Sequence, residues 1–193
     1  MRKTVLGFDT SGGWCTAAIV RDGAVLAERH MTLPRGQGEA LMPLLEAVLH
    51  EAGTVWADLA AIGVGTGPGN FTGIRISVSA ARGLALGLGI PAIGVDRFEA
   101  LALDGPPLPV VVPALRGQIW VRQSPDDPVL HDAPPVTAIG ESEGLTPPAH
   151  PLGVAIALIA ADRAGTPQPR PAPLYLRDAD AAPSSITPPA LIE

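Results

Sequence analysis

A glycine-rich stretch is the first part of this sequence whose residue types could do chemistry. GTGPGNFTGIR, residues 65–75, follows an apolar run and precedes a helix-like one. Such a loop can present backbone N–H groups to a phosphate. It has no Gly-Lys-Ser/Thr ending, however, and it does not fit the G-x-G-x-x-G spacing. The stretch therefore predicts either a phosphate-binding loop or, as the favoured alternative, a tight turn that starts a helix.

Other residue types that catalyse reactions or bind metals are present without the spacing that such sites need. None of the four histidines forms a metal-ligand pair with another on one helix. Ser11, Ser77 and Ser79 are not framed by a G-x-S-x-G elbow, which argues against a serine peptidase. The single cysteine excludes an internal disulfide and disfavours a structural zinc site. The sequence therefore predicts no catalytic residues and no metal site.

The composition indicates a globular protein that does not bind nucleic acid unaided. Of the 193 residues, 47% are apolar and 17% are charged, which is enough apolar material for a buried core. The formal net charge is −6, whereas a protein that binds RNA by itself normally has a basic excess. We find no signal peptide pattern and no membrane-spanning pattern, so we expect a cytoplasmic protein.

The elements that must position these residues follow an α/β order. In chain order we expect strands at 4–8, 15–20 and 24–29, a helix at 34–53, a strand at 59–65, a helix at 73–88 and a strand at 90–95. The first three strands form an antiparallel meander, and the two later ones are apolar throughout, as buried parallel strands are. The composition changes near residue 105. We therefore expect a lobe over 1–104 and a smaller one over 105–193, with a Pro-rich mobile tail over about 183–193.

The helix predicted over 73–88 has little side-chain bulk. It is rich in Gly, Ala and Ser, although glycine is unfavourable inside a helix. Small residues let another element approach closely, so a packing reason is expected. The neighbour is either the sheet of this chain or a helix of another subunit.

The segment FDTSGG resembles the first phosphate loop of the actin–hexokinase–Hsp70 (ASKHA) superfamily. By that resemblance Asp9 would lie near a metal ion, and Thr10 and Ser11 would face phosphate; otherwise the segment is a polar hairpin turn. An ATPase of this kind needs a second such loop. In the corresponding hairpin, Pro113 and Ala114 stand where an acidic residue is expected. One side of the nucleotide clamp is therefore missing, and Asp9, Thr10 and Ser11 are vestigial phosphate-loop candidates.

A longer stretch, residues 63–101, resembles the signature of the TsaB (YeaZ) family. It joins the glycine turn, the small-residue helix and a strand that begins with Gly-Ile-Pro. DTS at 9–11, LMPLLEAVL at 41–49 and YLRDAD at 175–180 are also similar to that family. The resemblance implies an actin-like, ribonuclease H-like two-lobed α/β fold. Its mixed sheet would have three antiparallel strands and then parallel strands flanked by helices, and here the second lobe is shortened.

The same resemblance implies a function in making threonylcarbamoyladenosine next to the anticodon of tRNA. The chain would be a non-catalytic scaffold that binds and activates the TsaD transferase, so it would not itself be an enzyme. The P-loop ATPase TsaE would join this complex, and a homodimer would use the same surface. The resemblance implies no cofactor of its own, ATP only at an interface within the complex, tRNA only through the complex, and no membrane. The alternative is an ATP-binding phosphotransferase or ATPase of the actin-like fold.

The helices of the first lobe are expected to form the partner surface. The candidates are Leu41, Leu45, Val48 and Leu49 on the first helix, and Ile74, Arg75, Val78, Ala81 and Ala85 on the second. Arg75, on the first turn of its helix, is expected to contact the other lobe or the partner.

Two short segments depart from the family pattern. Gln37-Gly38-Glu39 stands where the family usually has His-Ser-Glu, and Pro113-Ala114-Leu115 stands where it usually has Asp-Ala-Arg. These departures weaken any nucleotide-binding role of the second lobe, and they leave the scaffold role unaffected.

Overall fold

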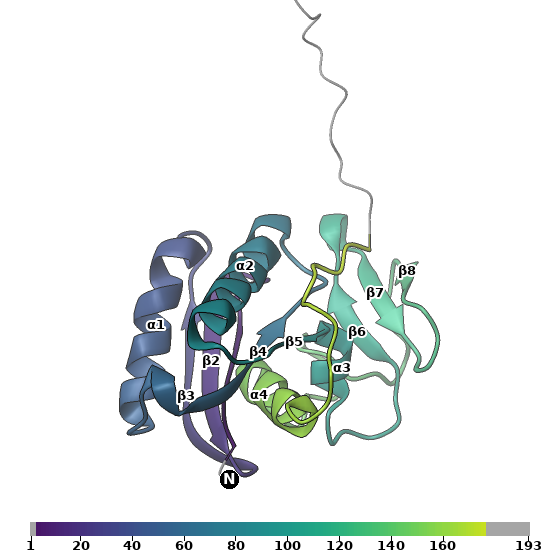
Figure 1. Ribbon diagram of the computed structural model, residues 1–193. Coiled ribbons are helices and arrows are strands. Elements are labelled where there is room, and N and C mark those ends of the chain that lie inside the picture. Colours follow the sequence, from purple (N-terminus) through teal and green to yellow (C-terminus); the bar gives the residue numbers. More distant parts are fainter. Residues whose placement is uncertain (1–2, 177–193) are drawn as a thin grey trace, which may run out of the picture.

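The computed structural model describes residues 3–176, which form two sheets and four α-helices (Figure 1). The elements are β1 (Thr4–Asp9), β2 (Trp14–Arg21), β3 (Ala24–Thr32), α1 (Gln37–Glu51), the 3-10 helix η1 (Trp56–Asp58), β4 (Leu59–Gly65), α2 (Phe71–Leu88), β5 (Ala92–Val95), α3 (Arg97–Ala102), β6 (Val110–Pro113), the 3-10 helix η2 (Leu115–Gly117), β7 (Ile119–Arg122), β8 (Val129–His131) and α4 (Leu152–Arg163). The tail over 183–193, expected to be mobile, lies outside the described residues.

The larger sheet has the strand order β3-β2-β1-β4-β5. β2 pairs antiparallel with both β1 and β3, whereas β4 pairs parallel with β1, and β5 pairs parallel with β4. This is the predicted α/β fold class, with three antiparallel strands followed by parallel ones. Every residue of β1 is buried, as expected for a central strand that helices cover on both faces.

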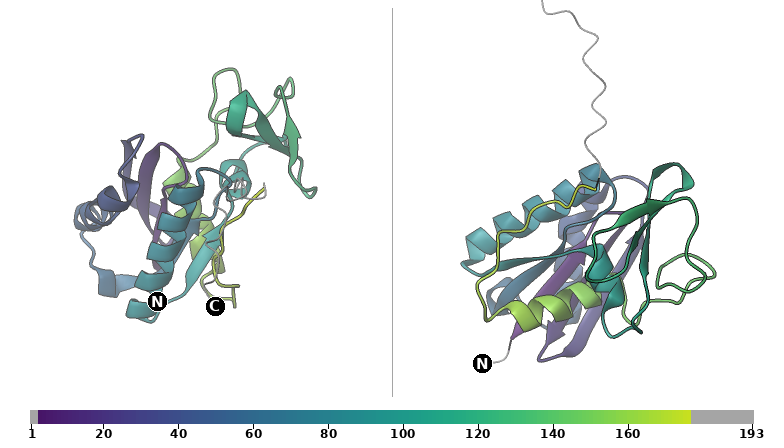
Figure 2. Two further views of the ribbon diagram at one scale, coloured as in Figure 1. Left: turned by 90° about the horizontal axis from the view of Figure 1, so that it is seen from above. Right: turned by 90° about the vertical axis from the view of Figure 1, so that its right-hand side faces the viewer.

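Helices cover both faces of this sheet. α1 and α2 lie on one face and α4 on the other (Figure 2). Gly7 and Gly63 make the α4 contact possible, because a Cβ at either position would come closer than 3.0 Å to the backbone or side chains of α4. α4 follows the second sheet in the chain but packs on the first. The division of the chain into lobes at residues 104 and 105 remains a prediction. Such a division would assign α4 to the second lobe, although α4 packs on the sheet of the first.

The smaller sheet is the antiparallel series β6-β7-β8. Phe98 and Leu101 of α3 pack with Val110, Val112 and Ile139, so α3 joins this sheet to the larger one. Seen from above, the smaller sheet projects beyond the end of the larger one (Figure 2). No helix within residues 3–176 is both long and apolar enough to cross a bilayer.

Candidate functional site

The two phosphate-loop candidates pack against each other. A Cβ on Gly65 would come closer than 3.0 Å to the carboxylate of Asp9, and one on Gly73 equally close to the carbonyl oxygen of Thr10. The hydroxyl of Thr10 donates a hydrogen bond to the carbonyl oxygen of Gly73 at 2.7 Å. Glycine is required at both positions because the turn that contains Asp9 fills the space where side chains would lie.

Asn70 completes this packing and caps α2. Its backbone N–H donates to the carbonyl oxygen of Ser11 at 2.6 Å, and its Oδ1 accepts from the N–H of Gly73 at 2.9 Å. A Cβ on Gly69 would overlap Ser11. The tight-turn interpretation thus accounts for these glycines, since the residues of the chain itself occupy the loop.

Asp9 is buried and fully engaged at one oxygen. It is 1% exposed, and its Oδ1 accepts hydrogen bonds from the N–H of Ser11 at 2.8 Å, the hydroxyl of Ser11 at 2.8 Å and Nε1 of Trp14 at 3.1 Å. Burial raises the pKa of the Asp9 carboxyl, although the Ser11 hydrogen bonds and the charge of Arg97 oppose this. Within residues 3–176, no three His, Cys, Asp or Glu side chains gather as a metal site would require.

A cleft of about 880 Å³ lies beside this turn. Its walls are Ser11, Gly12, Gly13, Trp14, Pro34, Gln37, Pro68, Gly69, Asn70, Phe71, Arg97, Pro113, Ala114, Leu115, Trp120, Leu174, Tyr175 and Leu176. The segments that depart from the family pattern both reach it. Gln37 donates hydrogen bonds from Nε2 to the carbonyl oxygens of Gly12 and Leu33, at 3.1 and 3.3 Å. Pro113, Ala114 and Leu115 give the far wall apolar side chains where a clamp would need a carboxylate.

Arg97 is the buried cation of this cleft. It is 6% exposed, its Nη2 pairs with Glu141, and its guanidinium carbon lies 4.8 Å from the centre of the Trp14 ring. Its Nε has no hydrogen-bond partner within the described residues. Sequence reasoning missed this residue, because only the fold brings the start of α3 beside the loop after β1.

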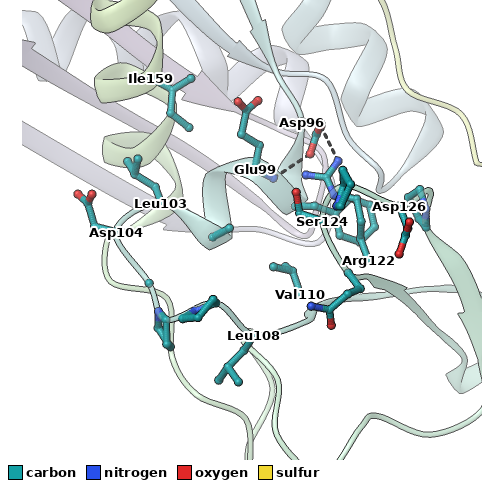
Figure 3. Close-up of a pocket in the computed structure, with 18 of the residues that line it drawn as sticks. Asp96, Glu99, Leu103, Asp104, Leu108, Val110, Arg122, Ser124, Asp126 and Ile159 are labelled. Atoms are coloured by element: carbon teal, nitrogen blue, oxygen red, sulfur yellow. Dashed lines mark hydrogen bonds and ion pairs between the residues drawn. The ribbon is translucent and has the colours of Figure 1, made fainter.

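A second cavity, of about 1030 Å³, lies between α3, α4 and the smaller sheet (Figure 3). Asp96 caps α3 by accepting from the N–H of Glu99 at 2.8 Å, and its other oxygen accepts from Nη1 of Arg122 at 2.9 Å. Arg163 of α4 pairs with Glu99. Asp96 is thus paired with Arg122 and Glu99 with Arg163, and the first of these pairs links the end of the larger sheet to the smaller one.

The predicted partner-surface residues lie inside the molecule. Each of the eight apolar ones is 5% exposed or less and belongs to the core between the two helices and the sheet: Leu41, Leu45, Val48, Leu49, Ile74, Val78, Ala81 and Ala85. The prediction that they face a partner is wrong, because their helical spacing marks the side of each helix that packs on this chain's own sheet.

Arg75, the ninth candidate, is exposed and contacts the C-terminal segment of the described chain. Its Nε donates to the hydroxyl of Tyr175 at 2.8 Å, and its guanidinium carbon lies 3.7 Å from the centre of the Phe71 ring. Arg75 therefore joins the start of α2 to Tyr175, a residue of the predicted second lobe (105–193), as one of its two expected contacts requires.

The outer face of α2 is open around Gly83 and Gly87. A Cβ on Gly83 or Gly87 would have no neighbour within 4 Å, and neither glycine has a positive φ. Leu86, between them, is 85% exposed. The high glycine content of this helix was the sequence signal for a close contact with another element. The structure shows that Gly83 and Gly87 make no such contact within the described chain.

Comparisons with known proteins agree with this fold. The model of the family "TsaD: tRNA N6-adenosine threonylcarbamoyltransferase" matches residues 34–127. TsaB of Escherichia coli, the "tRNA threonylcarbamoyladenosine biosynthesis protein", is 38% identical over 98 residues, which are 51% of this chain and 42% of that protein. The chain thus matches less than half of the E. coli protein's length.

Two further similarities extend over most of the chain. An uncharacterized protein of Mycobacterium bovis is 34% identical over 209 residues, covering 95% of this chain and 96% of that protein. The solved structure of YeaZ from Pseudomonas aeruginosa covers 90% of this chain and 100% of its own, with a TM-score of 0.72 and 23% identity, and so supports the fold. The turn of residues 65–73, the small-residue helix after it and the mixed sheet are thus those of a known group: the chain belongs to the TsaB (YeaZ) family.

Proposed function

We propose that this chain is a non-catalytic scaffold subunit in the biosynthesis of threonylcarbamoyladenosine on tRNA, and that it binds and activates a TsaD-type transferase. The names of its relatives support the pathway. The match to the TsaD family model over residues 34–127 supports a pairing of two chains of related fold, because related surfaces readily form pseudo-symmetric dimers.

The open glycines of α2 carry the pairing part of the proposal. Glycine inside a helix costs about 1 kcal/mol relative to alanine. Gly83 and Gly87 have no packing reason within the described chain, and they lie four residues apart on one face. A helix of another subunit can approach such a face closely, with exposed Leu86 as its apolar contact.

The remaining partners follow from the same proposal. A TsaE-type P-loop ATPase joins the complex, and a homodimer uses the α2 face when the transferase is absent. tRNA is bound through the complex, since a chain with net charge −6 lacks the positive field for its phosphates. ATP enters only at an interface within the complex.

The alternative function is an ATP-dependent phosphotransferase or ATPase of the actin-like fold. The cleft beside the DTS turn is the observation that favours it. Against it, Asp9 is enclosed by three hydrogen-bond donors, and the opposite wall presents Pro113, Ala114 and Leu115. Among the residues that the structure describes, neither wall then offers a carboxylate for the magnesium ion that ATP chemistry uses.

Leu86→Glu tests the scaffold. The side chain is exposed, so the isolated variant should fold like the wild type, but a charge at the centre of the interface should weaken pairing with the TsaD-type subunit at least tenfold. The modified nucleoside in bulk tRNA should fall with it. Val136→Glu, at an even more exposed apolar position on the loop after β8, is the matched control and should change neither. A Leu86→Glu chain that cannot pair yet supports full modification would disprove the scaffold role.

A further inference from the structure

The cleft beside the DTS turn (residues 9–11) is lined by most of the aromatic residues of this protein. The chain has three Trp, three Phe and one Tyr, and four of these line the cleft: Trp14, Phe71, Trp120 and Tyr175. Its volume of about 880 Å³ lies within the range of small-ligand sites, which are mostly apolar with a few fixed polar groups. This concentration of rings in an aromatic-poor chain favours a ligand with a flat ring.

The charges around the cleft disfavour a polyanion. Among residues 3–176, Arg97 is the only charged residue that lines it, and Glu141 already pairs with its guanidinium. The described part of the chain places no lysine and no carboxylate on the walls to hold phosphates or a magnesium ion. A triphosphate would therefore lose its hydration without gaining an unpaired cation.

The polar groups gather at the DTS turn. Gln37 and Asn70 each donate one hydrogen bond to this turn. Nε2 of Gln37 donates to the carbonyl oxygen of Gly12, and the backbone N–H of Asn70 donates to that of Ser11. Oε1 of Gln37 and Nδ2 of Asn70 have no partner within residues 3–176 and are left as one acceptor and one donor. Trp120 and Leu176, by contrast, pack together with the apolar core of the smaller sheet. The cleft thus joins a hydrogen-bonding region to an apolar, ring-lined one.

We infer that this cleft binds an uncharged nucleoside-like molecule, a planar ring with a hydroxylated end, in preference to a nucleoside triphosphate. The ring lies against the aromatic side chains, and the hydroxyl groups meet Gln37 and Asn70. This inference does not depend on the pairing proposed above, because the outer face of α2 contributes no residue to the cleft.

Tryptophan fluorescence of the full-length protein tests it directly. Trp14 and Trp120 line the cleft, whereas the third tryptophan, Trp56, lies in η1 and does not. Adenosine should change the emission saturably, and magnesium-ATP should bind no more tightly than adenosine. Trp56→Phe should keep the response. Trp120→Leu, which keeps an apolar side chain but removes the ring, should weaken adenosine binding about tenfold, the effect of losing one ring contact, as read by saturation-transfer NMR.

Ala114→Phe provides a second variant, because it fills the cleft from a position outside the core and should abolish binding. Three results would overturn the inference: no saturable response to adenosine, magnesium-ATP binding at least tenfold more tightly than adenosine, or unchanged adenosine binding by Ala114→Phe. None of these results would bear on pairing through α2. Adenosine binding therefore tests the cleft proposal, and pairing of the Leu86→Glu variant tests the scaffold proposal, independently of each other.

Discussion

Replacing Gly83 by alanine should stabilise the isolated chain and weaken the proposed complex with a TsaD-type subunit. Gly83 lies inside α2 with ordinary helical geometry, and an added Cβ would meet nothing within 4 Å. The methyl group therefore costs no packing, and the unfolded chain loses conformational freedom. In the complex the same methyl group would stand between two closely packed helices.

The size of both effects follows from this geometry. The gain in the free energy of unfolding should be about 1 kcal/mol, which raises the Tm of a domain of this size by about 2 to 4 °C. Overpacking a close helix contact costs typically about 1 to 3 kcal/mol, so the Kd for the TsaD-type subunit should rise about tenfold or more. Urea denaturation, at a concentration at which the chain is monomeric, gives the first quantity, and calorimetric titration gives the second.

Gly73→Ala is the matched control, the same change at the other end of the same helix. Its Cβ would overlap the carbonyl oxygen of Thr10, so this variant should lose stability despite the same gain in helix propensity. If Gly83→Ala also lost stability, residue 83 would have a packing role within the chain. If Gly83→Ala bound the TsaD-type subunit as tightly as the wild type, the α2 face would not be the contact surface.

Two further predictions concern buried charge. Glu141→Gln should lower the free energy of unfolding by about 1 to 3 kcal/mol, because it leaves the buried guanidinium of Arg97 without its counter-charge. Urea denaturation at low and at high salt measures this loss. An unchanged denaturation midpoint would contradict the Arg97–Glu141 pair. For Asp9, burial holds the folded pKa above the ordinary value of 3.8, so the folded state binds more protons and stability falls as pH rises from 3.8 through the folded pKa. The stability of the wild type relative to Asp9→Asn should therefore decline with rising pH across that window, and a rise would refute the burial argument.

The sequence by itself determined the order and type of the elements around the site. Three local signals predicted these elements: the turn dipeptide Asp22-Gly23 between two strand-like runs, the all-apolar run over 59–65, and the apolar spacing of the two helices. β2–β3, β4, α1 and α2 form where these signals predict. The glycine stretch was favoured as a turn that starts a helix, because it lacks the residues that a phosphate loop needs, and α2 begins at Phe71 within it.

Sequence periodicity could not tell which neighbour each helix face meets. Leu45 and Ala81 belong to an apolar stripe, and a stripe fits a subunit interface as well as it fits a sheet of the same chain. The fold assigns both residues to its own core, which leaves Gly83 and Leu86 on the outer face.

Tertiary structure alone decided the contacts between distant segments. It packs the DTS turn against the glycine turn and places Arg97 beside Trp14. It also packs α4 on the face of the larger sheet opposite to α1 and α2. These contacts join residues far apart in the chain. They depend on single glycines, where a Cβ would clash, and on single ion pairs, and neither produces a periodic pattern in the sequence. Spacing reports what lies along one element, whereas a cleft is made by elements that meet only when the chain has folded.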